Sequence, residues 1–407
     1  MKKIILFLVA CICSITSWAV EYAPIANLEY IHNAIADKYD ITIQYNAAVT
    51  DVTSAANMKY LLTAIDVANK KQGQQTNYGT SEYATEFAAN IITVNTAIDT
   101  LIKPKQDEEP EEPEPGAELL VPPYVFALET NAISSFSFDI AATGTFFVDW
   151  GDGITETYPR TSTNSQSVSH TYATSAPQTI RIGGLATGYN STSDVASVSF
   201  ASRSAIKSIY GSLGKIFPTL ADGSQPSFYR TFYYNYNLTG PVPKKLFAGV
   251  TGAPRSYMFY QTFYNCSEIT DIQDGLFGGL DGAPASSMFR ETFFNCAKLK
   301  KIPNNLFGNL YGRPELQMFY GTFDSCSGLT GEIPLGLFGN LENYYRSNMF
   351  FQTFKNCSGL TGPSARMPDG TYLYNYFTTG SGYSPMTSLY RGCTGLSDYS
   401  SMPSSVK

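Results

Sequence analysis

Five cysteines recur at nearly constant spacing in the last third of the chain, at positions 266, 296, 326, 357 and 393. A thiol can act as a nucleophile, a metal ligand or half of a disulfide, and each of these roles needs a second group. No histidine follows His170, so no imidazole in this region could activate a thiolate. The odd number of cysteines also argues against a disulfide framework. The spacing therefore favours small buried hydrophobes of a repeated structure over thiol chemistry.

A second group of reactive side chains surrounds the stretch "DWGDG" at 149–153. Asp149, Asp152 and the later His170 could form a catalytic or metal-binding cluster, because carboxylates and imidazole serve both purposes. The alternative is a tight turn, in which the glycines take positive φ and Asp152 accepts hydrogen bonds from nearby amides. Trp150 would then fill the core beside the turn. We favour the turn, and we predict that Trp150 is buried.

The cysteines belong to a repeat of about thirty residues. The stretch "QTFYNC" at 261–266 returns as "ETFFNC" at 291–296, "GTFDSC" at 321–326 and "QTFKNC" at 352–357. Such a period is typical of units that each cover an apolar face of the next. Within one unit, Met288, Thr292, Phe293 and Cys296 fall at helical spacing, and a short extended piece follows. We therefore predict an α/β solenoid of about 30-residue units over 204–407.

The chain before the repeats divides into three further parts. Residues 20–102 carry apolar residues at helical spacing and predict a small helical bundle. The acidic, proline-rich stretch "KPKQDEEPEEPEPGA" at 103–117 predicts an extended linker. From 118 to 203 the apolar period becomes two, as in Phe136, Phe138 and Ile140, which predicts an all-β sandwich. The predicted fold class is thus multidomain: helical bundle, β-sandwich and α/β solenoid.

The N-terminus and the composition indicate an exported protein. Residues 1–19 have a basic start, a short apolar stretch and small residues before a cleavage point after Ala19, as a signal peptide has. Alternatively, Cys11 could be lipidated and serve as a lipid anchor. The apolar stretch is too short to cross a bilayer, so we expect no transmembrane segment. The net charge of −7, without a basic cluster, argues against nucleic-acid binding.

Two motifs resemble known families of extracellular modules. Trp150-Gly151-Asp152-Gly153 with the later His170-x-Tyr172 resembles the PKD domain, an immunoglobulin-like sandwich. The spacing "F-x-x-C-x-x-L-x-x-I-P" resembles the leucine-rich repeats of bacterial surface proteins of the BspA type. The second resemblance implies a secreted or cell-surface bacterial protein whose partner is a surface protein or glycan of a host or of the surrounding community.

These observations lead us to expect a secreted or surface-exposed interaction or adhesion protein that binds a protein or glycan partner. The alternative is a carbohydrate-binding protein for polysaccharide capture, which the tyrosine-rich stretches 232–237, 343–351 and 372–377 favour. An enzyme is a third hypothesis, but the chain has only two histidines and no nucleophile motif with a partner, so we expect no enzyme, metal or cofactor. The variable positions of the repeat predict a binding ladder of exposed aromatics, formed by Tyr260, Tyr264, Phe294, Tyr320 and Phe351. Alternatively, these rings pack against the neighbouring unit.

Overall fold

A computed structural model describes residues 116–120, 122–382 and 384–407. The chain divides into two compact units, Met1–Glu112 and Pro113–Lys407, and the described residues belong to the second. The predicted signal peptide, the helical bundle predicted for 20–102 and nearly all of the predicted linker 103–117 lie outside the described residues.

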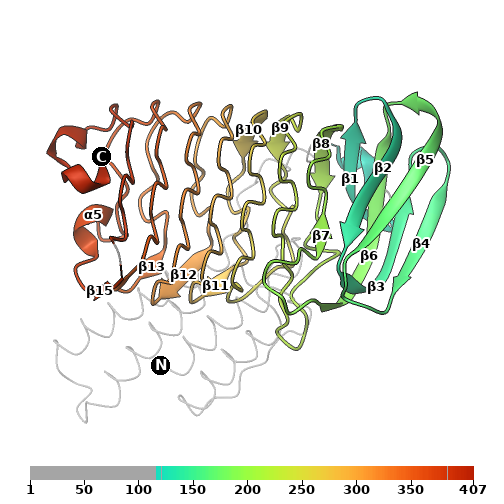
Figure 1. Cartoon of the computed structure of the whole chain (residues 1–407), viewed down its shortest axis with the longest axis horizontal. Coiled ribbons are helices and arrows are strands. Elements are labelled where there is room, and N and C mark those ends of the chain that lie inside the picture. Colours follow the sequence, from blue (N-terminus) through green and yellow to red (C-terminus); the bar gives the residue numbers. More distant parts are fainter. Residues whose placement is uncertain (1–115, 121, 383) are drawn as a thin grey trace, which may run out of the picture. The chain divides into compact units, whose positions relative to one another are not determined.

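The first part of this unit consists of two antiparallel sheets, shown in cyan and green in Figure 1. A short 3-10 helix, η1 (Ala117–Leu119), precedes them. One sheet has five strands in the order β4-β3-β6-β1-β8, and the other has three in the order β5-β2-β7. Their bounds are β1 (Tyr124–Thr130), β2 (Ile133–Ile140), β3 (Ala142–Asp149), β4 (Thr155–Arg160), β5 (Gln166–Ala176), β6 (Thr179–Tyr189), β7 (Val198–Ser199) and β8 (Ile206–Gly211).

Apolar and polar residues alternate along these strands, and the apolar side chains are buried between the two sheets. Phe138 on β2 and Phe146 on β3 are fully buried. Trp150, which directly follows β3, has no exposed surface and contacts Phe138 at 6.2 Å between ring centroids, which confirms its predicted burial. Such alternation forms because successive side chains of a strand point to opposite faces of the sheet.

After β8 the chain forms a stack of coils, each about thirty residues long, in which short parallel strands pair with the previous coil (Figure 1). The strands form rows at opposite ends of the coils: β9 and β10 at one end, and β11, β12 and β13 at the other. Their bounds are β9 (Gly240–Val242), β10 (Ile269–Ile272), β11 (Asp281–Gly282), β12 (Asn309–Gly312) and β13 (Asn340–Leu341). The last coils add β14 (Tyr345–Arg346), α5 (Leu373–Tyr376), β15 (Gly380–Ser381), η2 (Tyr399–Ser401) and η3 (Ser404–Val406).

Each coil contains a turn segment, which we define as residues 257–266 and their counterparts 287–296, 317–326 and 348–357. Amides along it alternate between two kinds of partner. The amide N of Tyr260 donates within the coil to Tyr257 O at 3.1 Å, whereas the amide N of Gln261 donates to Arg290 O of the next coil at 2.9 Å. Every fourth residue has a positive φ, as at Tyr257 (59°) and Gln261 (52°). This alternation satisfies the backbone without a helix.

The predicted fold class is wrong, and the turn segment shows why. Strands, bridges and turns make up most of the described residues, and the one α-helix among them is the four-residue α5. An α-helix needs each amide to bond four residues back. Here every second amide bonds to the next coil instead, and the left-handed residues interrupt any run of helical φ angles. The α/β solenoid expected for 204–407 is therefore replaced by a stack of non-helical coils.

Columns of stacked phenylalanines form the core of the stack. One column is Phe228, Phe259, Phe289, Phe319 and Phe350, with successive ring centroids 5.4–5.6 Å apart. A second begins at Phe232, whose ring stacks at 5.5 Å on Phe200 of the first part. Phe200 in turn stacks on Phe138 at 5.1 Å. The hydrophobic core therefore runs without interruption from the antiparallel sheets into the coils.

The threonine and the cysteine of each repeat bond to the backbone of the preceding coil. The hydroxyls of Thr262, Thr292, Thr322 and Thr353 donate at 2.8–2.9 Å to phenylalanine carbonyls one coil back. The thiols of Cys266, Cys296, Cys326, Cys357 and Cys393 do the same at 2.8–3.2 Å. In the first coil the amide of Asn235 replaces the thiol and donates to Phe200 O at 3.0 Å. The repeated residue types are thus small side chains that donate one hydrogen bond inside an apolar core.

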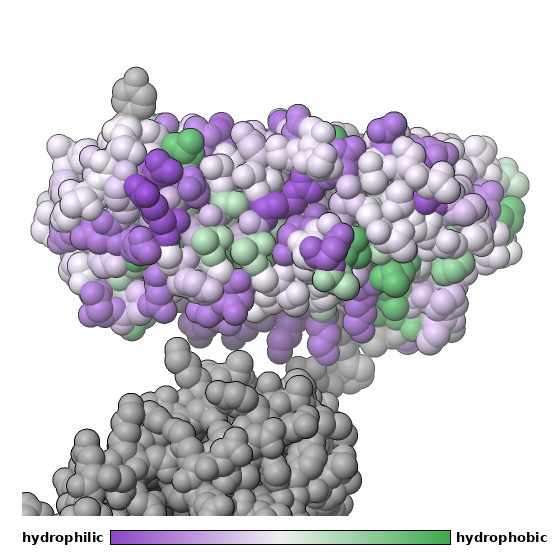
Figure 2. Space-filling model, turned by 90° about the horizontal axis from the view of Figure 1, so that it is seen from below, coloured by the Kyte–Doolittle hydropathy of each residue, from purple (hydrophilic) through white to green (hydrophobic). Residues whose placement is uncertain are grey.

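The five thiols are free and buried, as we predicted for structural cysteines. Burial raises the pKa of each thiol above its usual value, for Cys393 to about 12. A neutral buried thiol is a weak nucleophile. Figure 2 shows strongly hydrophobic residues scattered over the lower face of the described unit, some toward the end formed by the antiparallel sheets and some toward the opposite end.

Candidate functional site

A column of rings and one guanidinium lines the outer side of the turn segments. We call it the first column: Tyr229, Tyr260, Arg290, Tyr320 and Phe351. Tyr229 and Tyr260 stack at 5.0 Å with nearly parallel planes. The Arg290 guanidinium lies between two rings, 5.7 Å from the centroid of Tyr260 and 4.3 Å from that of Tyr320. Tyr320 then stacks on Phe351 at 4.7 Å. Arg290 thus replaces a ring and keeps the column continuous.

A second column lies four residues further along each turn segment: Tyr233, Tyr264, Phe294, Asp324 and Lys355. Tyr264 contacts Tyr233 at 5.1 Å and stacks on Phe294 at 4.5 Å. The column then becomes charged, because Lys355 Nζ lies 3.2 Å from Asp324 Oδ2. Asp324 is only 2% exposed, so this ion pair is largely shielded from water. The second column is therefore aromatic at the end near the antiparallel sheets and ionic further on.

A row of polar side chains lies between the two columns, at the left-handed residues Gln261 and Glu291 of two turn segments and at Arg230, the equivalent left-handed residue one coil earlier. Arg230 Nε donates to Gln261 Oε1 at 2.7 Å, and Gln261 Nε2 donates to Glu291 Oε2 at 2.7 Å. The Arg230 guanidinium also lies 4.8 Å from the ring of Tyr233 and 5.6 Å from that of Tyr260. This row therefore joins the first column to the second. We call the two columns and this row the ladder face.

The rings of the ladder face are held in fixed orientations. Tyr260 has Tyr229 on one side and Arg290 on the other, and Tyr320 has Arg290 and Phe351. Each cation–π contact contributes about 0.5–1 kcal/mol when exposed, and more when shielded from water. Burial also raises the pKa of Tyr264, to about 12. The Tyr264 hydroxyl therefore stays protonated at neutral pH and can both donate and accept hydrogen bonds.

The five aromatics predicted to form one ladder are divided between the two columns. Tyr260, Tyr320 and Phe351 belong to the first column, and Tyr264 and Phe294 belong to the second. All five are half-buried, so they pack on neighbouring coils and also reach the surface. Sequence reasoning missed the roles of Arg230, Gln261 and Glu291. The place of Arg290 in the first column was predictable from the sequence, because Arg290 occupies the repeat position that holds aromatics in the adjacent units.

The residues around "DWGDG" have local partners. Asp149 Oδ1 accepts from the amide of Gly151 at 3.0 Å, and Asp152 Oδ1 accepts from that of Ile154 at 3.1 Å. His170 stacks on Trp150 at 5.1 Å, and its Nε2 lies 2.8 Å from Asp152 Oδ2. This hydrogen bond is the main cause that lowers the pKa of Asp152. The group therefore forms the turn that we favoured from the sequence. No three potential metal ligands cluster within the part of the chain that the structure describes.

Comparison with protein-family models, with curated proteins and with solved structures finds no match to this chain. Among residues 116–120, 122–382 and 384–407, no helix has both the length and the apolar character needed to span a bilayer.

Proposed function

We propose that this chain is a secreted or surface-exposed bacterial interaction protein that binds a protein partner through the ladder face. The observation that carries the proposal is the way the rings are stacked. Tyr260 and Tyr320 are covered on both faces by the neighbours above and below them in the first column. They offer a partner their edges and hydroxyl groups, and not an open ring face.

This geometry suits a protein better than a sugar. An aromatic side chain that binds a sugar usually does so with an uncovered face, whereas tyrosine and arginine at protein interfaces contribute through edges, hydroxyls and guanidinium groups. The ladder face combines these residue types. Its side chains are already ordered by stacking and by the polar row, so binding would cost little conformational entropy. The predicted signal peptide and the resemblance of the repeat to those of BspA-type surface proteins support an extracellular role in adhesion.

A binding role is also favoured over catalysis. The carboxylates of Asp149 and Asp152 accept hydrogen bonds from turn amides, and the described thiols are buried. A catalytic nucleophile or general base needs access to a substrate. The partner would be a surface protein of a host or of the surrounding microbial community.

An array of extracellular host proteins and bacterial surface proteins, with a glycan array beside it, tests the proposal. The informative variant combines Tyr260→Phe with Tyr320→Phe, because it keeps both rings stacked and removes only their hydroxyls. Tyr311→Phe is the matched control, since Tyr311 is 49% exposed and lies on β12, outside the ladder face. We expect the double variant to keep its melting temperature and to bind its array protein about tenfold more weakly, as the loss of two hydrogen bonds would give. Binding that is confined to glycans, or that is unchanged in the double variant, would contradict the proposal.

A further inference from the structure

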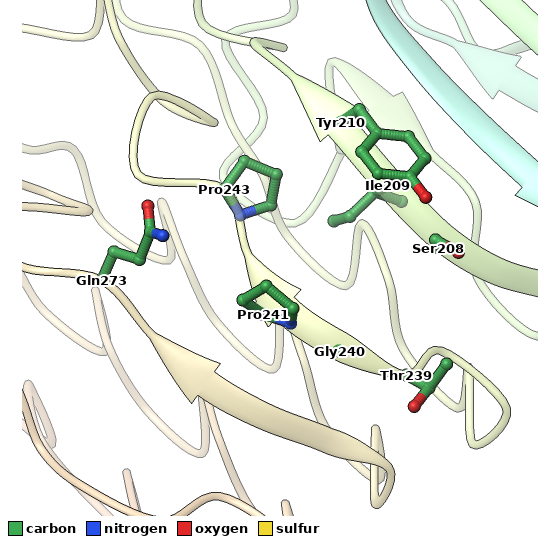
Figure 3. A pocket seen from close by; sticks show the side chains of 8 residues that line it. All are labelled: Ser208, Ile209, Tyr210, Thr239, Gly240, Pro241, Pro243 and Gln273. Atoms are coloured by element: carbon green, nitrogen blue, oxygen red, sulfur yellow. The ribbon is translucent and has the colours of Figure 1, made fainter. Parts of the chain in front are cut away.

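A pocket of about 200 Å³ lies where the antiparallel sheets meet the first coils. Its walls come from three neighbouring strands. Ser208, Ile209 and Tyr210 belong to β8, Gly240 and Pro241 belong to β9, and Gln273 directly follows β10. Thr239 and Pro243 complete the lining. Figure 3 shows the ring of Tyr210 beside Pro243, with Gln273 and Thr239 at separate sides of the group. The pocket does not overlap the ladder face.

The polar groups at this pocket are preorganised by a carboxylate. Glu129 on β1 pairs with Ser208 across the sheet. Its Oε2 accepts a hydrogen bond from Ser208 Oγ at 3.1 Å and another from Tyr210 OH at 2.7 Å. Both hydroxyl protons are therefore engaged, and the hydroxyl oxygens are left as acceptors. Opposite them, Gln273 Oε1 accepts from the amide N of Lys244 at 3.0 Å, which leaves the Nε2 group of Gln273 as the donor of that side chain.

The ring of Tyr210 differs from the rings of the ladder face. No other aromatic ring of the described residues stacks on it. The backbone of Gly116 packs against it, and a Cβ added at Gly116 would lie 2.2 Å from Tyr210 Cδ1. Tyr210 is thus a supported apolar wall, with the prolines Pro241 and Pro243 as the other apolar surfaces. An apolar wall with a few fixed polar groups is the usual composition of a small-molecule site.

We propose that this pocket binds one ring of a neutral sugar. The volume is below the roughly 300–1,000 Å³ of sites for drug-sized ligands, so it has room for a single small ring. The hydroxyl oxygens of Ser208 and Tyr210, whose protons Glu129 accepts, face the pocket as acceptors and favour a ligand that brings several donors, as sugar hydroxyls do. A proline-rich peptide would also fit between tyrosine and proline side chains, but its backbone lacks N–H donors at the prolines. The acceptor oxygens of Ser208 and Tyr210 therefore favour the hydroxylated ligand.

This proposal does not depend on the ladder face. It would give the protein a glycan contact separate from its protein-binding surface. One sugar ring in an open pocket should bind weakly, with a dissociation constant on the order of 1 mM.

Saturation-transfer NMR and calorimetry with the full chain test the proposal. The probes are D-glucose, D-galactose, D-mannose and N-acetyl-D-glucosamine, and a capped tri-proline peptide is added as the competing ligand class. We expect at least one of the four sugars to bind in the millimolar range and the peptide not to bind. If none of the four sugars binds at 20 mM, or if only the peptide binds, the proposal is wrong.

Two variants locate the binding. Glu129→Gln keeps the volume of the side chain and removes the charged acceptor that orients the hydroxyls of Ser208 and Tyr210, so it should weaken sugar binding at least fivefold. Gln273→Ala removes the Nε2 donor on the opposite side of the pocket and should weaken sugar binding about threefold. The matched control is Glu268→Gln, which changes a half-buried carboxylate that pairs with Lys298 away from the pocket. Circular dichroism checks that each variant is folded. Sugar binding that is equal in Glu129→Gln, Gln273→Ala and the control would place the ligand elsewhere and overturn the assignment.

Discussion

Replacement of Thr292 by valine isolates the hydrogen bond that we hold responsible for the repeated threonine. Thr292 is fully buried, and its Oγ1 donates to Phe259 O of the preceding coil at 2.8 Å. Valine has nearly the same shape but cannot donate. The carbonyl keeps one partner, because the amide N of Thr262 also donates to it at 3.3 Å. The substitution therefore removes one bond and does not leave a buried acceptor without a partner.

The magnitude follows from this geometry. A typical internal hydrogen bond contributes about 0.5–1.5 kcal/mol net. The new methyl group must also fit where an oxygen lay 2.8 Å from a carbonyl, and the close-packed core can move only slightly. We expect a loss of about 1–2 kcal/mol in the free energy of unfolding. For a unit of this size, a loss of 1 kcal/mol lowers the melting temperature by about 2–4 °C.

Thermal unfolding followed by circular dichroism measures the effect, and Thr330→Val serves as the control. Thr330 is exposed, and its Oγ1 donates to Lys300 O at 3.2 Å, where water can replace it. The control should change stability by no more than about 0.5 kcal/mol. If Thr292→Val is as stable as the wild type, or if both variants lose the same amount, the buried hydroxyl is not a reason for the repeated threonine.

Three further predictions concern the core, the thiols and the linker. Trp150→Ala should cost about 3–5 kcal/mol, as large-to-small core substitutions do, and the native emission of Trp150 should be blue-shifted; a maximum typical of water-exposed tryptophan would contradict its burial. Burial raises the pKa of the thiols above the unfolded value of about 8.5, to about 12 for Cys393, so their contribution to stability should be complete below about pH 8 and lost between about pH 9 and 12 in denaturant titrations. A midpoint that stays constant over this pH range would refute the assigned burial. Limited proteolysis within 103–117 should release a folded fragment 118–407, since few contacts cross a charged, proline-rich linker; aggregation or unfolding of that fragment after cleavage would show that the linker is packed.

The repeat period was readable from the sequence, but the conformation inside each repeat was not. Inward side chains of a turn segment, such as Phe289 and Phe293, recur every four residues. Over ten residues a period of four cannot be distinguished from the 3.6 of a helix. The difference lies in the left-handed residues Ser287, Glu291 and Asn295, with φ of 53–55°. Only asparagine among these three types is enriched at positive φ, so composition gave little sign of it.

The candidate site was likewise only partly predictable. Aromatics at variable repeat positions indicated a ladder, and the residues predicted for it do lie along two columns of one surface. The division into columns depends on the geometry of the turn segment, which a helical interpretation misplaces. The polar row of Arg230, Gln261 and Glu291 depends on contacts between side chains about thirty residues apart. Such contacts follow from the register of the coils, and no local pattern encodes them.

Hydroxyl-radical footprinting of the complex tests the central claim most directly, namely that the ladder face binds a protein. The complex is formed with the protein that the array identifies, and oxidation of individual side chains is measured by mass spectrometry. We predict that Tyr260 and Tyr320 are oxidised at least several-fold more slowly in the complex, whereas the exposed Tyr311 on β12 is oxidised at the same rate as in the free protein. Unchanged oxidation of Tyr260 and Tyr320, or protection of Tyr311 in their place, would show that the partner binds a different surface.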